Sequence, residues 1–380
     1  WHLWTGYEAE ALQKVVDEFN QTHEDIQVKL VSTDFQKQLT ALASGSGPDI
    51  AGNFNFNVAS WASKGAMLDL TDLIKQDNYD IEDFVPAALE MVTYKDRIYA
   101  FPLAMHVYMV YYNKDILKEA GYDNVPEKLS EFKTMIEKVT IKKNGNFERL
   151  GYDPSDLLNV AAIFGAKYIS DDGKEILEDP AIIKAMKFNK EYADKFGYED
   201  IRKYTSTFGK YMSPDNPFFT GQLVVKFDGE WLTVFIDKFA PNLNYGIAPL
   251  PYPDDQPELK NSGYASSSVI YISGSTKHPK EAWTFLKWLV SKEPMVKFTS
   301  EIGNLPTRKS AMSDPAYDHI KGFKEFLEYA QGENVHPIPS MKPANEYVTE
   351  LGNLYEQVLT NKISPEEAMK RLKEKLDPEM

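Results

Sequence analysis

The sequence predicts an α/β protein with two lobes, each formed by separate stretches of the chain. Strand and helix patterns alternate through the first hundred residues, and such βαβα units imply right-handed crossovers and mostly parallel sheets flanked by helices. A chain of 380 residues also favours more than one domain. Strand-forming segments near both 1–112 and 264–308 can belong to one lobe. We therefore expect the chain to cross between lobes about three times, which gives a hinge that bends in one direction.

The first hundred residues contain the predicted elements of the first lobe. Residues 1–4 and 26–31 predict strands, because they are apolar or alternate apolar and polar residues. Residues 12–19 carry apolar side chains at positions i, i+3, i+4 and i+7, the stripe of an amphipathic helix. Asp34 is a typical N-cap for a second helix, and Ile50 begins the next short strand.

A hairpin, two strands and a helix are expected to follow one another closely. A turn at 95–96 leads into a strand that ends at Pro102. A second strand is expected over 107–112, and Asn113 is a good N-cap for a helix over 114–120.

The rest of the chain alternates further strands and helices. The expected strands are 222–227, 244–250 and 268–272. The expected helices are 182–196, 281–290, 320–329, 347–359 and 365–376, together with one that begins at Trp231 after a turn over 228–230.

Composition excludes several classes of function. The formal net charge of −15 argues against nucleic-acid backbones and anionic lipid, which attract clustered Lys and Arg. The absence of cysteine excludes disulfides, thiolate catalysis and zinc–thiolate sites. No apolar run reaches the ~18 residues of a membrane span. Because the sequence opens at Trp1 with a strand-like segment, we expect that a leader segment has been removed.

The usual catalytic signatures are also missing. The sequence contains no Gly-x-Ser-x-Gly elbow, phosphate loop, His-Glu-x-x-His helix or dinucleotide fingerprint. Its 6 histidines lack the spacing of metal ligands. Carboxylates are abundant, so a secreted glycoside hydrolase stays open as an alternative to a binding protein. A surface adhesin or scaffold, which would have no ligand pocket, is a third hypothesis.

Eight segments, taken in order, resemble family 1 extracellular solute-binding proteins, the capture subunits of ABC sugar importers. They are 1–6 (WHLWTG), 43–50 (ASGSGPDI), 65–71 (GAMLDLT), 99–115, 219–222 (FTGQ), 228–231 (DGEW), 244–251 (NYGIAPLP) and 303–308 (GNLPTR). The resemblance covers residues 1–359 and is greatest to the branch that contains maltodextrin-binding and other oligosaccharide-binding proteins. Each segment is a weak signal, but their common order makes the resemblance specific.

The resemblance implies a two-lobed, Venus-flytrap periplasmic-binding-protein fold. The first lobe is expected over 1–108 and 266–308 and the second over 113–262 and 312–380, with hinges near 104–112, 262–267 and 303–312. It further implies a monomer without a cofactor that captures a neutral oligosaccharide between the lobes and delivers it to ABC permease subunits. Such a protein works in the periplasm or from a lipid anchor on a Gram-positive cell surface. Relatives on this scaffold also bind other polar solutes such as glycerol phosphates.

Candidate binding residues follow from the chemistry of sugars, which present hydroxyls at their edges and C–H patches on their faces. Such ligands bind beyond the carboxyl ends of strands in open α/β sheets. The loops at these positions contain Thr5, Tyr7, Glu8, Phe35, Gln36, Asn53, Phe54, Asn55 and Phe56. The resemblance adds His106 beside a hinge and Trp231 as a stacking aromatic. Further candidates are Asp153, Tyr211, Gly263, Tyr264, Met341 and Asn345.

These candidates also have structural interpretations. Thr5 and Glu8 suit a helix cap, a lone histidine such as His106 is more often structural, and Trp231 can be a core indole. The alternating Asn and Phe of 53–56 favour binding, because an amide is costly to bury without partners. This loop lacks the charged residues that maltodextrin-binding relatives have there. Lys342 is the only basic residue in the candidate loops, which favours a neutral ligand.

Overall fold

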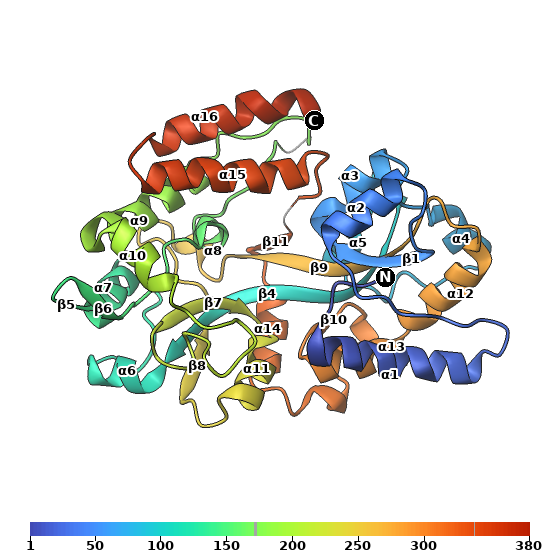
Figure 1. Cartoon of the computed structure of the whole chain (residues 1–380), viewed down its shortest axis with the longest axis horizontal. Helices are drawn as coiled ribbons and strands as arrows, with labels where there is room; N and C mark the ends of the chain where they lie inside the picture. The colour runs from blue at the N-terminus through green and yellow to red at the C-terminus, as the bar shows by residue number, and fades with distance from the viewer. Residues whose placement is uncertain (171–172, 338) are drawn as a thin grey trace. The chain divides into compact units, whose positions relative to one another are not determined.

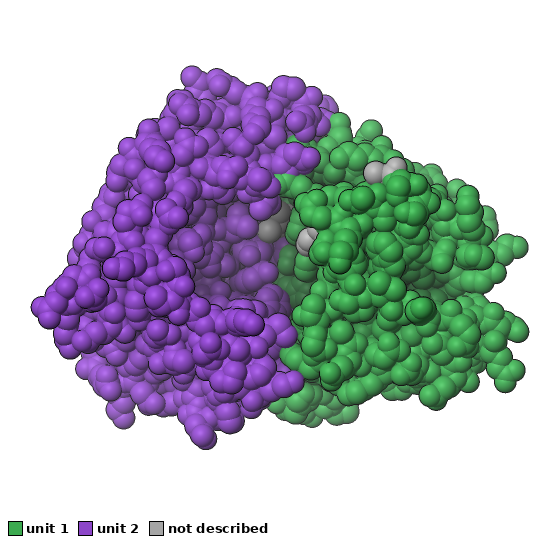
Figure 2. Space-filling model, viewed as in Figure 1, with its two compact units in different colours: residues 1–106, 266–323, 337–345 green, residues 107–265, 324–336, 346–380 purple. Residues whose placement is uncertain are grey.

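The chain divides into two compact units. The computed structural model describes residues 1–170, 173–337 and 339–380, except for the side chains of Phe35 and Ala43. Unit 1 comprises Trp1–His106, Ser266–Phe323 and Pro337–Asn345, and unit 2 comprises Val107–Ala265, Lys324–His336 and Glu346–Met380 (Figure 2). Each unit is therefore assembled from separate stretches of the chain, in an α/β fold.

Most of the elements are labelled in Figure 1. The helices of unit 1 are α1 (Gly6–Thr22), α2 (Phe35–Ala43), α3 (Val58–Ser63), α4 (Thr71–Gln76), α5 (Pro86–Glu90), α12 (Pro279–Leu289) and α13 (Lys292–Ile302). Its strands are β1 (Ile50–Phe54), β2 (Thr93–Tyr94), β3 (Arg97–Ile98) and β10 (Leu305–Pro306). The strands β4 (Phe101–Asn113) and β9 (Gly263–Ile272) continue from one unit into the other.

Unit 2 is richer in helix. Its helices are α6 (Lys114–Glu119), α7 (Leu129–Val139), α8 (Leu157–Ile163), α9 (Pro180–Phe196), α10 (Tyr198–Thr205), α11 (Leu232–Phe239) and α16 (Pro365–Leu376). Most of α14 (Phe323–Ala330) and α15 (Ala344–Leu359) also belongs to it. Its strands are β5 (Ile141–Lys143), β6 (Asn146–Arg149), β7 (Val225–Gly229) and β8 (Tyr245–Ala248), and β11 (Val335–Pro337) begins in it.

Local sequence signals account for several of these elements. The predicted apolar stripe of α1 is buried in the core of unit 1, where α1 packs against α12 and α13 (Figure 1). Asp34 accepts a hydrogen bond from the Lys37 N–H and caps α2, and Asn113 caps α6 in the same way. The helices predicted after Pro180 and over 365–376 are confirmed.

The expectation of mostly parallel sheets is wrong for the described strands. β1 pairs with β9, β10 with β4, and both β7 and β8 with β4, all antiparallel. Among the described residues of unit 1, parallel pairing is limited to the isolated bridge between His2 and Ser32 and to Trp1, whose amino group donates to the Ile50 carbonyl and whose carbonyl accepts from the Gly52 N–H. Predicted strands 1–4 and 26–31 therefore make short contacts rather than ladders. The long strands instead meet neighbours that arrive from distant parts of the sequence.

The hairpin at 95–96 is confirmed, because β2 and β3 pair across it and both turn residues have positive φ. The expected break at Pro102 is wrong, since β4 continues through it as one strand to Asn113. Proline is tolerated here because it lies at the start of the strand, where its carbonyl accepts a hydrogen bond from Thr307 at 2.6 Å.

Two segments expected in the second lobe belong to unit 1 instead. The first is 312–323, where Tyr317 stacks on Phe323 and its hydroxyl pairs with that of Thr299 at 2.6 Å. The second is 337–345, where Ser340 Oγ accepts a hydrogen bond from the Ala59 N–H at 2.9 Å. The bond between Ser340 and Ala59 joins residues 281 positions apart, so no local sequence pattern predicts it.

The strand expected over 222–227 begins and ends later than predicted. β7 runs Val225–Gly229, so Asp228 and Gly229 lie in the ladder rather than in a turn. There they are opposite Met109 and Tyr108 of β4. Trp231 lies two residues after Gly229, so the register of β7 against β4 determines which side chains of β4 lie near it.

Among the described residues, no helix has the length and apolarity needed to cross a membrane. The same part of the chain holds no group of three or more side chains suited to a metal ion.

Candidate functional site

Unit 2 contains a compact group of side chains at the end of β7, which we call the indole cluster. It comprises Tyr108, Tyr211, Lys226, Asp228 and Trp231. Trp231 lies at the N-cap of α11 and is partly exposed, whereas Asp228 is 4% exposed. Tyr108 of β4 meets the indole edge to face, with ring centroids 5.6 Å apart and an interplanar angle of 89°.

Hydrogen bonds connect the indole to a buried ion pair. Trp231 Nε1 donates to Tyr211 Oη at 2.7 Å, and Tyr211 Oη donates to the two carboxylate oxygens of Asp228 at 2.8 and 2.9 Å. Lys226 Nζ lies 3.1 Å from Asp228 Oδ2 and 4.3 Å from the centre of the Tyr211 ring. The indole orientation is therefore defined by named polar partners as well as by packing.

Glycine is required beneath the indole. A Cβ atom at Gly229 would lie 2.1 Å from Trp231 Cζ3, so only a residue without a side chain allows the ring to rest against the backbone. The Gly229 peptide is itself held, because its N–H donates to Asp228 Oδ1 at 2.8 Å and its carbonyl accepts from Tyr111 Oη at 2.8 Å.

Tyr211 stays a neutral phenol in this setting. Although 39% of the residue is exposed, its hydroxyl lies between the indole N–H and the Asp228 carboxylate. Burial first, and then the negative charge of Asp228, raises the pKa of the Tyr211 hydroxyl well above 10.

Other predicted residues of unit 2 lie near or outside this cluster. Tyr264 is 8% exposed and its ring lies 4.6 Å from that of Tyr108. Gly263 fills a structural role, since a Cβ there would come within 2.4 Å of Tyr329 Oη. Asp153 accepts a hydrogen bond from the Ser155 N–H in its own turn.

Unit 1 contains a second group, which we call the histidine cluster. It comprises Glu8 from α1, Phe54 from β1, His106 from β4 and Ser268 from β9. His106 Nε2 and Ser268 Oγ are 2.9 Å apart, and Ser268 is opposite Phe54 in the β1–β9 register. His106 is 5% exposed.

Glu8 has the most perturbed carboxyl of this cluster. Burial raises the pKa of Glu8 from 4.5 to about 7, while His106 and the backbone N–H of Thr5 oppose the shift. At neutral pH this carboxyl therefore exists in both protonation states, so it can donate or accept a hydrogen bond.

Replacing Glu8 with glutamine is expected to flatten the pH dependence of unit 1 stability. Below about pH 4.5 the carboxyl is neutral in both the folded and the unfolded chain, so its raised pKa does not reduce the stability of the folded state in this range. As pH rises from 4.5 to about 7, ionisation in the unfolded chain increasingly favours unfolding, and above pH 7 the loss is constant. Between about pH 5 and about pH 8, the melting temperature should fall more for the wild type than for Glu8→Gln.

Glu10→Gln is the matched control, because Glu10 is exposed on the same helix. Glu10→Gln should show the same difference in melting temperature between the two pH values as the wild type. If the melting temperatures of the wild type and Glu8→Gln depend equally on pH, the raised pKa of Glu8 is contradicted.

The Asn and Phe side chains of the 53–57 segment have opposite environments. Asn55 is buried and its Oδ1 accepts a hydrogen bond from the Ser267 N–H at 2.9 Å. Asn57 Nδ2 donates to Asn53 Oδ1 at 2.9 Å, and both residues are buried. Phe54 and Phe56 are half-buried, with parallel rings 5.8 Å apart. The segment thus exposes its aromatic rings and buries its amides.

The remaining candidates of unit 1 are dispersed. Thr5 is exposed at the start of α1 without a side-chain cap bond, and Tyr7 packs against the unit 1 core. Gln36 is exposed on α2, and the Phe35 side chain lies outside the described part of the chain. Met341 is 4% exposed, and Asn345 is half-buried near the start of α15.

Sequence reasoning missed four residues of the two clusters. Tyr108 was detectable, because it is two residues after His106 in one strand and so shares its face of the strand. Asp228 and Lys226 alternate on β7: Lys226 lies within the strand predicted over 222–227 but was not singled out, whereas Asp228 joins the strand only in the structure. Ser268 joined the histidine cluster through cross-strand pairing, for which the sequence has no local signal.

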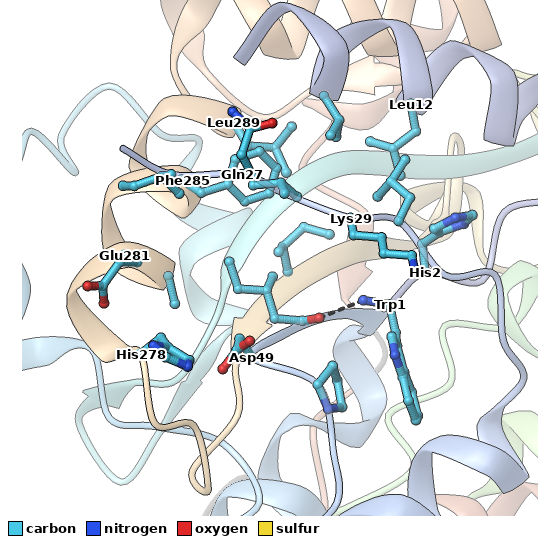
Figure 3. A pocket seen from close by; sticks show the side chains of 18 of the residues that line it. Trp1, His2, Leu12, Gln27, Lys29, Asp49, His278, Glu281, Phe285 and Leu289 are labelled. Carbon is cyan, nitrogen blue, oxygen red and sulfur yellow. Dashed lines mark hydrogen bonds between the residues drawn. The ribbon is translucent and has the colours of Figure 1, made fainter. Parts of the chain in front are cut away.

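A cavity of about 470 Å³ lies elsewhere in unit 1 (Figure 3). It is bordered by α1, α12 and the extended segment 25–30, and none of the predicted binding residues lines it. Trp1 at its edge donates a hydrogen bond from its amino group to the Ile50 carbonyl at 2.7 Å. Segment 26–31 was expected to be a strand, and because it forms no ladder its apolar side chains border this space.

Comparison with known proteins gives consistent matches. The family model for bacterial extracellular solute-binding proteins matches residues 5–296. The galactooligosaccharide-binding protein of Bacillus subtilis is 22% identical and covers 97% of this chain and 86% of its own. The multiple sugar-binding protein of Streptococcus mutans is 23% identical, and the match covers 80% of this chain and 73% of that protein.

Solved structures share the fold over the whole length. CpMnBP1 with mannotriose bound has a TM-score of 0.88 at 25% identity and covers 98% of both chains. Maltose-bound T. maritima MalE3 has a TM-score of 0.80 at 23% identity and covers 100% of both chains.

Proposed function

Since the chain belongs to the family of bacterial extracellular solute-binding proteins, we propose that it captures a neutral oligosaccharide for an ABC importer. The observation that carries this proposal is the indole cluster. It presents a partly exposed Trp231 whose orientation is defined by Tyr211 and Gly229. A planar indole suits the flat C–H face of a pyranose ring, and no reactive group is needed for such binding.

The histidine cluster supplies the polar groups for the hydroxyl edge of the same ligand. Glu8, His106 and Ser268 can donate or accept hydrogen bonds, as a sugar hydroxyl does. His106 and Tyr108 are separated by one residue of β4, so side chains of both clusters project from the same face of one strand. This continuity supports the view that both clusters contribute to binding one ligand.

Hinge bending near 104–112, 262–267 and 303–312 is part of the proposal. A ligand drives closure only if it contacts the closed form better than the open one, and residues contributed by both units meet this condition. The protein would act as a monomer without catalysis, outside the membrane, and the closed form would be recognised by permease subunits.

Charge favours a neutral ligand over a phosphorylated one. A phosphate group requires several unpaired cationic donors. Lys226, the basic residue of the indole cluster, is already paired with Asp228 at 3.1 Å. The names of the relatives and structural neighbours give the candidate ligands: galactooligosaccharides, mannotriose and maltose.

A thermal-shift screen tests the proposal. The panel contains mannobiose, mannotriose, maltotriose, galactooligosaccharides and glycerol 3-phosphate. A ligand at about 100 times its Kd should add about 2.7 kcal/mol of stability, and calorimetry should then give a saturable isotherm. The recovered sugar should be intact by mass spectrometry.

Two results would contradict the proposal. Shortened saccharides in the recovered sample would indicate a glycoside hydrolase. Stabilisation by glycerol 3-phosphate alone would replace the neutral ligand with a phosphorylated one.

A further inference from the structure

We infer that Tyr211 and Asp228 are positioning residues that hold the Trp231 indole at a fixed angle for stacking on a sugar ring. The inference rests on the proposed function and deepens it, because it names residues that act through the stacking aromatic. It also changes the role of Tyr211, which the sequence suggested as a direct ligand contact.

The hydroxyl of Tyr211 is committed to its protein partners. A phenol has one O–H to donate, and Tyr211 directs it to the Asp228 carboxylate at 2.8 and 2.9 Å. Its oxygen accepts the indole N–H of Trp231 at 2.7 Å. A sugar hydroxyl that approached Tyr211 Oη would have to compete with a charge-assisted bond, which is stronger than a neutral one.

The carboxylate at the end of this chain of hydrogen bonds is itself anchored. Asp228 is 4% exposed, its Oδ1 accepts the Gly229 N–H, and its Oδ2 pairs with Lys226 Nζ at 3.1 Å. A buried carboxylate needs such partners to offset the loss of its hydration. Asp228 is therefore a fixed acceptor that holds the Tyr211 hydroxyl in place. The Tyr211 hydroxyl in turn holds the indole N–H of Trp231.

Packing restricts the remaining freedom of the ring. The indole lies directly on Gly229, where a Cβ would come within 2.1 Å, and meets Tyr108 edge to face at 5.6 Å. These contacts limit tilting, while the bond to Tyr211 prevents the ring from flipping about its χ2 angle. A side chain ordered before binding loses less conformational entropy when the ligand arrives, so its stacking contributes more to affinity.

A double-mutant cycle between Tyr211→Phe and Trp231→Phe tests the inference, with oligosaccharide affinity measured by calorimetry. Either substitution removes one end of the indole–phenol hydrogen bond. Tyr211→Phe should weaken binding about 3- to 10-fold in the wild type, the range expected for one lost hydrogen bond. In the Trp231→Phe background it should change affinity less than about 1.5-fold, because the bond is already absent.

Tyr204→Phe is the matched control. Its hydroxyl also donates one hydrogen bond in unit 2, to the Glu148 carbonyl at 2.9 Å, but it lies outside the indole cluster. It should leave the affinity unchanged. Equal weakening by Tyr211→Phe in both backgrounds would overturn the inference in favour of direct ligand contact, and no weakening in the wild type would overturn it outright.

A second measurement separates this inference from the proposed function. The near-UV circular dichroism difference between the wild type and Trp231→Phe isolates the signal of the ordered Trp231 indole without any ligand. Tyr211→Phe should lose most of that signal and Tyr204→Phe should keep it. If no saccharide binds the wild type, the proposed function fails while this spectrum still decides whether Tyr211 holds the indole. A retained signal in Tyr211→Phe would overturn the inference.

Discussion

Replacing Trp231 with alanine is expected to weaken oligosaccharide binding about 5- to 150-fold while the protein stays folded. The indole is partly exposed and lies at the N-cap of α11, so its removal deletes the proposed ligand contact rather than core packing. Stacking of one aromatic ring contributes on the order of 1–3 kcal/mol, which converts to roughly 5- to 150-fold in affinity. Isothermal calorimetry with the strongest ligand of the screen measures the change.

Tyr122→Ala provides the control for an aromatic deletion in unit 2. Tyr122 is also partly exposed but follows α6, away from the indole cluster, where Lys138 lies over its ring at 5.3 Å. It should bind the ligand like the wild type. If Trp231→Ala retains both the wild-type Kd and the wild-type melting temperature, Trp231 does not contact the ligand.

Replacing Arg308 with methionine is expected to destabilise unit 1 by about 3 kcal/mol, because a buried guanidinium loses its hydrogen bonds and the half-buried Asp83 carboxylate loses its charged partner. Arg308 is 6% exposed. Its guanidinium donates to the Val290 carbonyl at 2.6 Å, to Asp83 Oδ2 at 3.1 Å and to Tyr79 Oη at 2.6 Å. It also lies 4.2 Å from the centre of the Phe84 ring. Methionine keeps most of the volume but leaves the Asp83 carboxylate and the Val290 carbonyl without this donor.

The expected fall in the melting temperature of unit 1 is about 10 °C. Scanning calorimetry measures it, since two units can melt in separate transitions. Arg97→Met is the comparison, because the Arg97 side chain is 42% exposed and its partners Asp69 and Asp72 are also reached by water. An exposed pair contributes less than about 1 kcal/mol, so this variant should melt within a few degrees of the wild type. Equal destabilisation by the two substitutions would contradict the structural role of Arg308.

Short-range features of the fold were predictable because their causes are local. The helix α1 follows from four apolar residues at helical spacing, and Asp34 and Asn113 cap helices through bonds that reach only three residues ahead. The hairpin at 95–96 likewise depends on two adjacent residues that adopt positive φ. Strand pairing was less predictable, because direction and register depend on which distant segments meet.

The residues of the candidate site also divide into those with a local sequence signal and those whose contacts depend on distant segments. Trp231 and His106 could be found in the sequence because they follow recognisable segments of a known family, and the match to residues 5–296 confirms that family. Their contacts could not be predicted, although Tyr211 was itself a candidate in the sequence. Asp228 and Tyr211 are 17 residues apart, and Ser268 is 162 residues from His106. Only a folded chain brings such side chains within hydrogen-bonding distance.

The sequence by itself determined the class of protein, several of the helical segments, and the aromatic and histidine side chains on which binding is proposed to depend. The tertiary structure decided the antiparallel pairing of the long strands, the allocation of 312–323 and 337–345 to unit 1, and the environment of each candidate side chain. The physical reason is the range of the interactions. Helix periodicity and capping act within one or two turns, whereas burial and cross-strand hydrogen bonds depend on residues that are neighbours only in space.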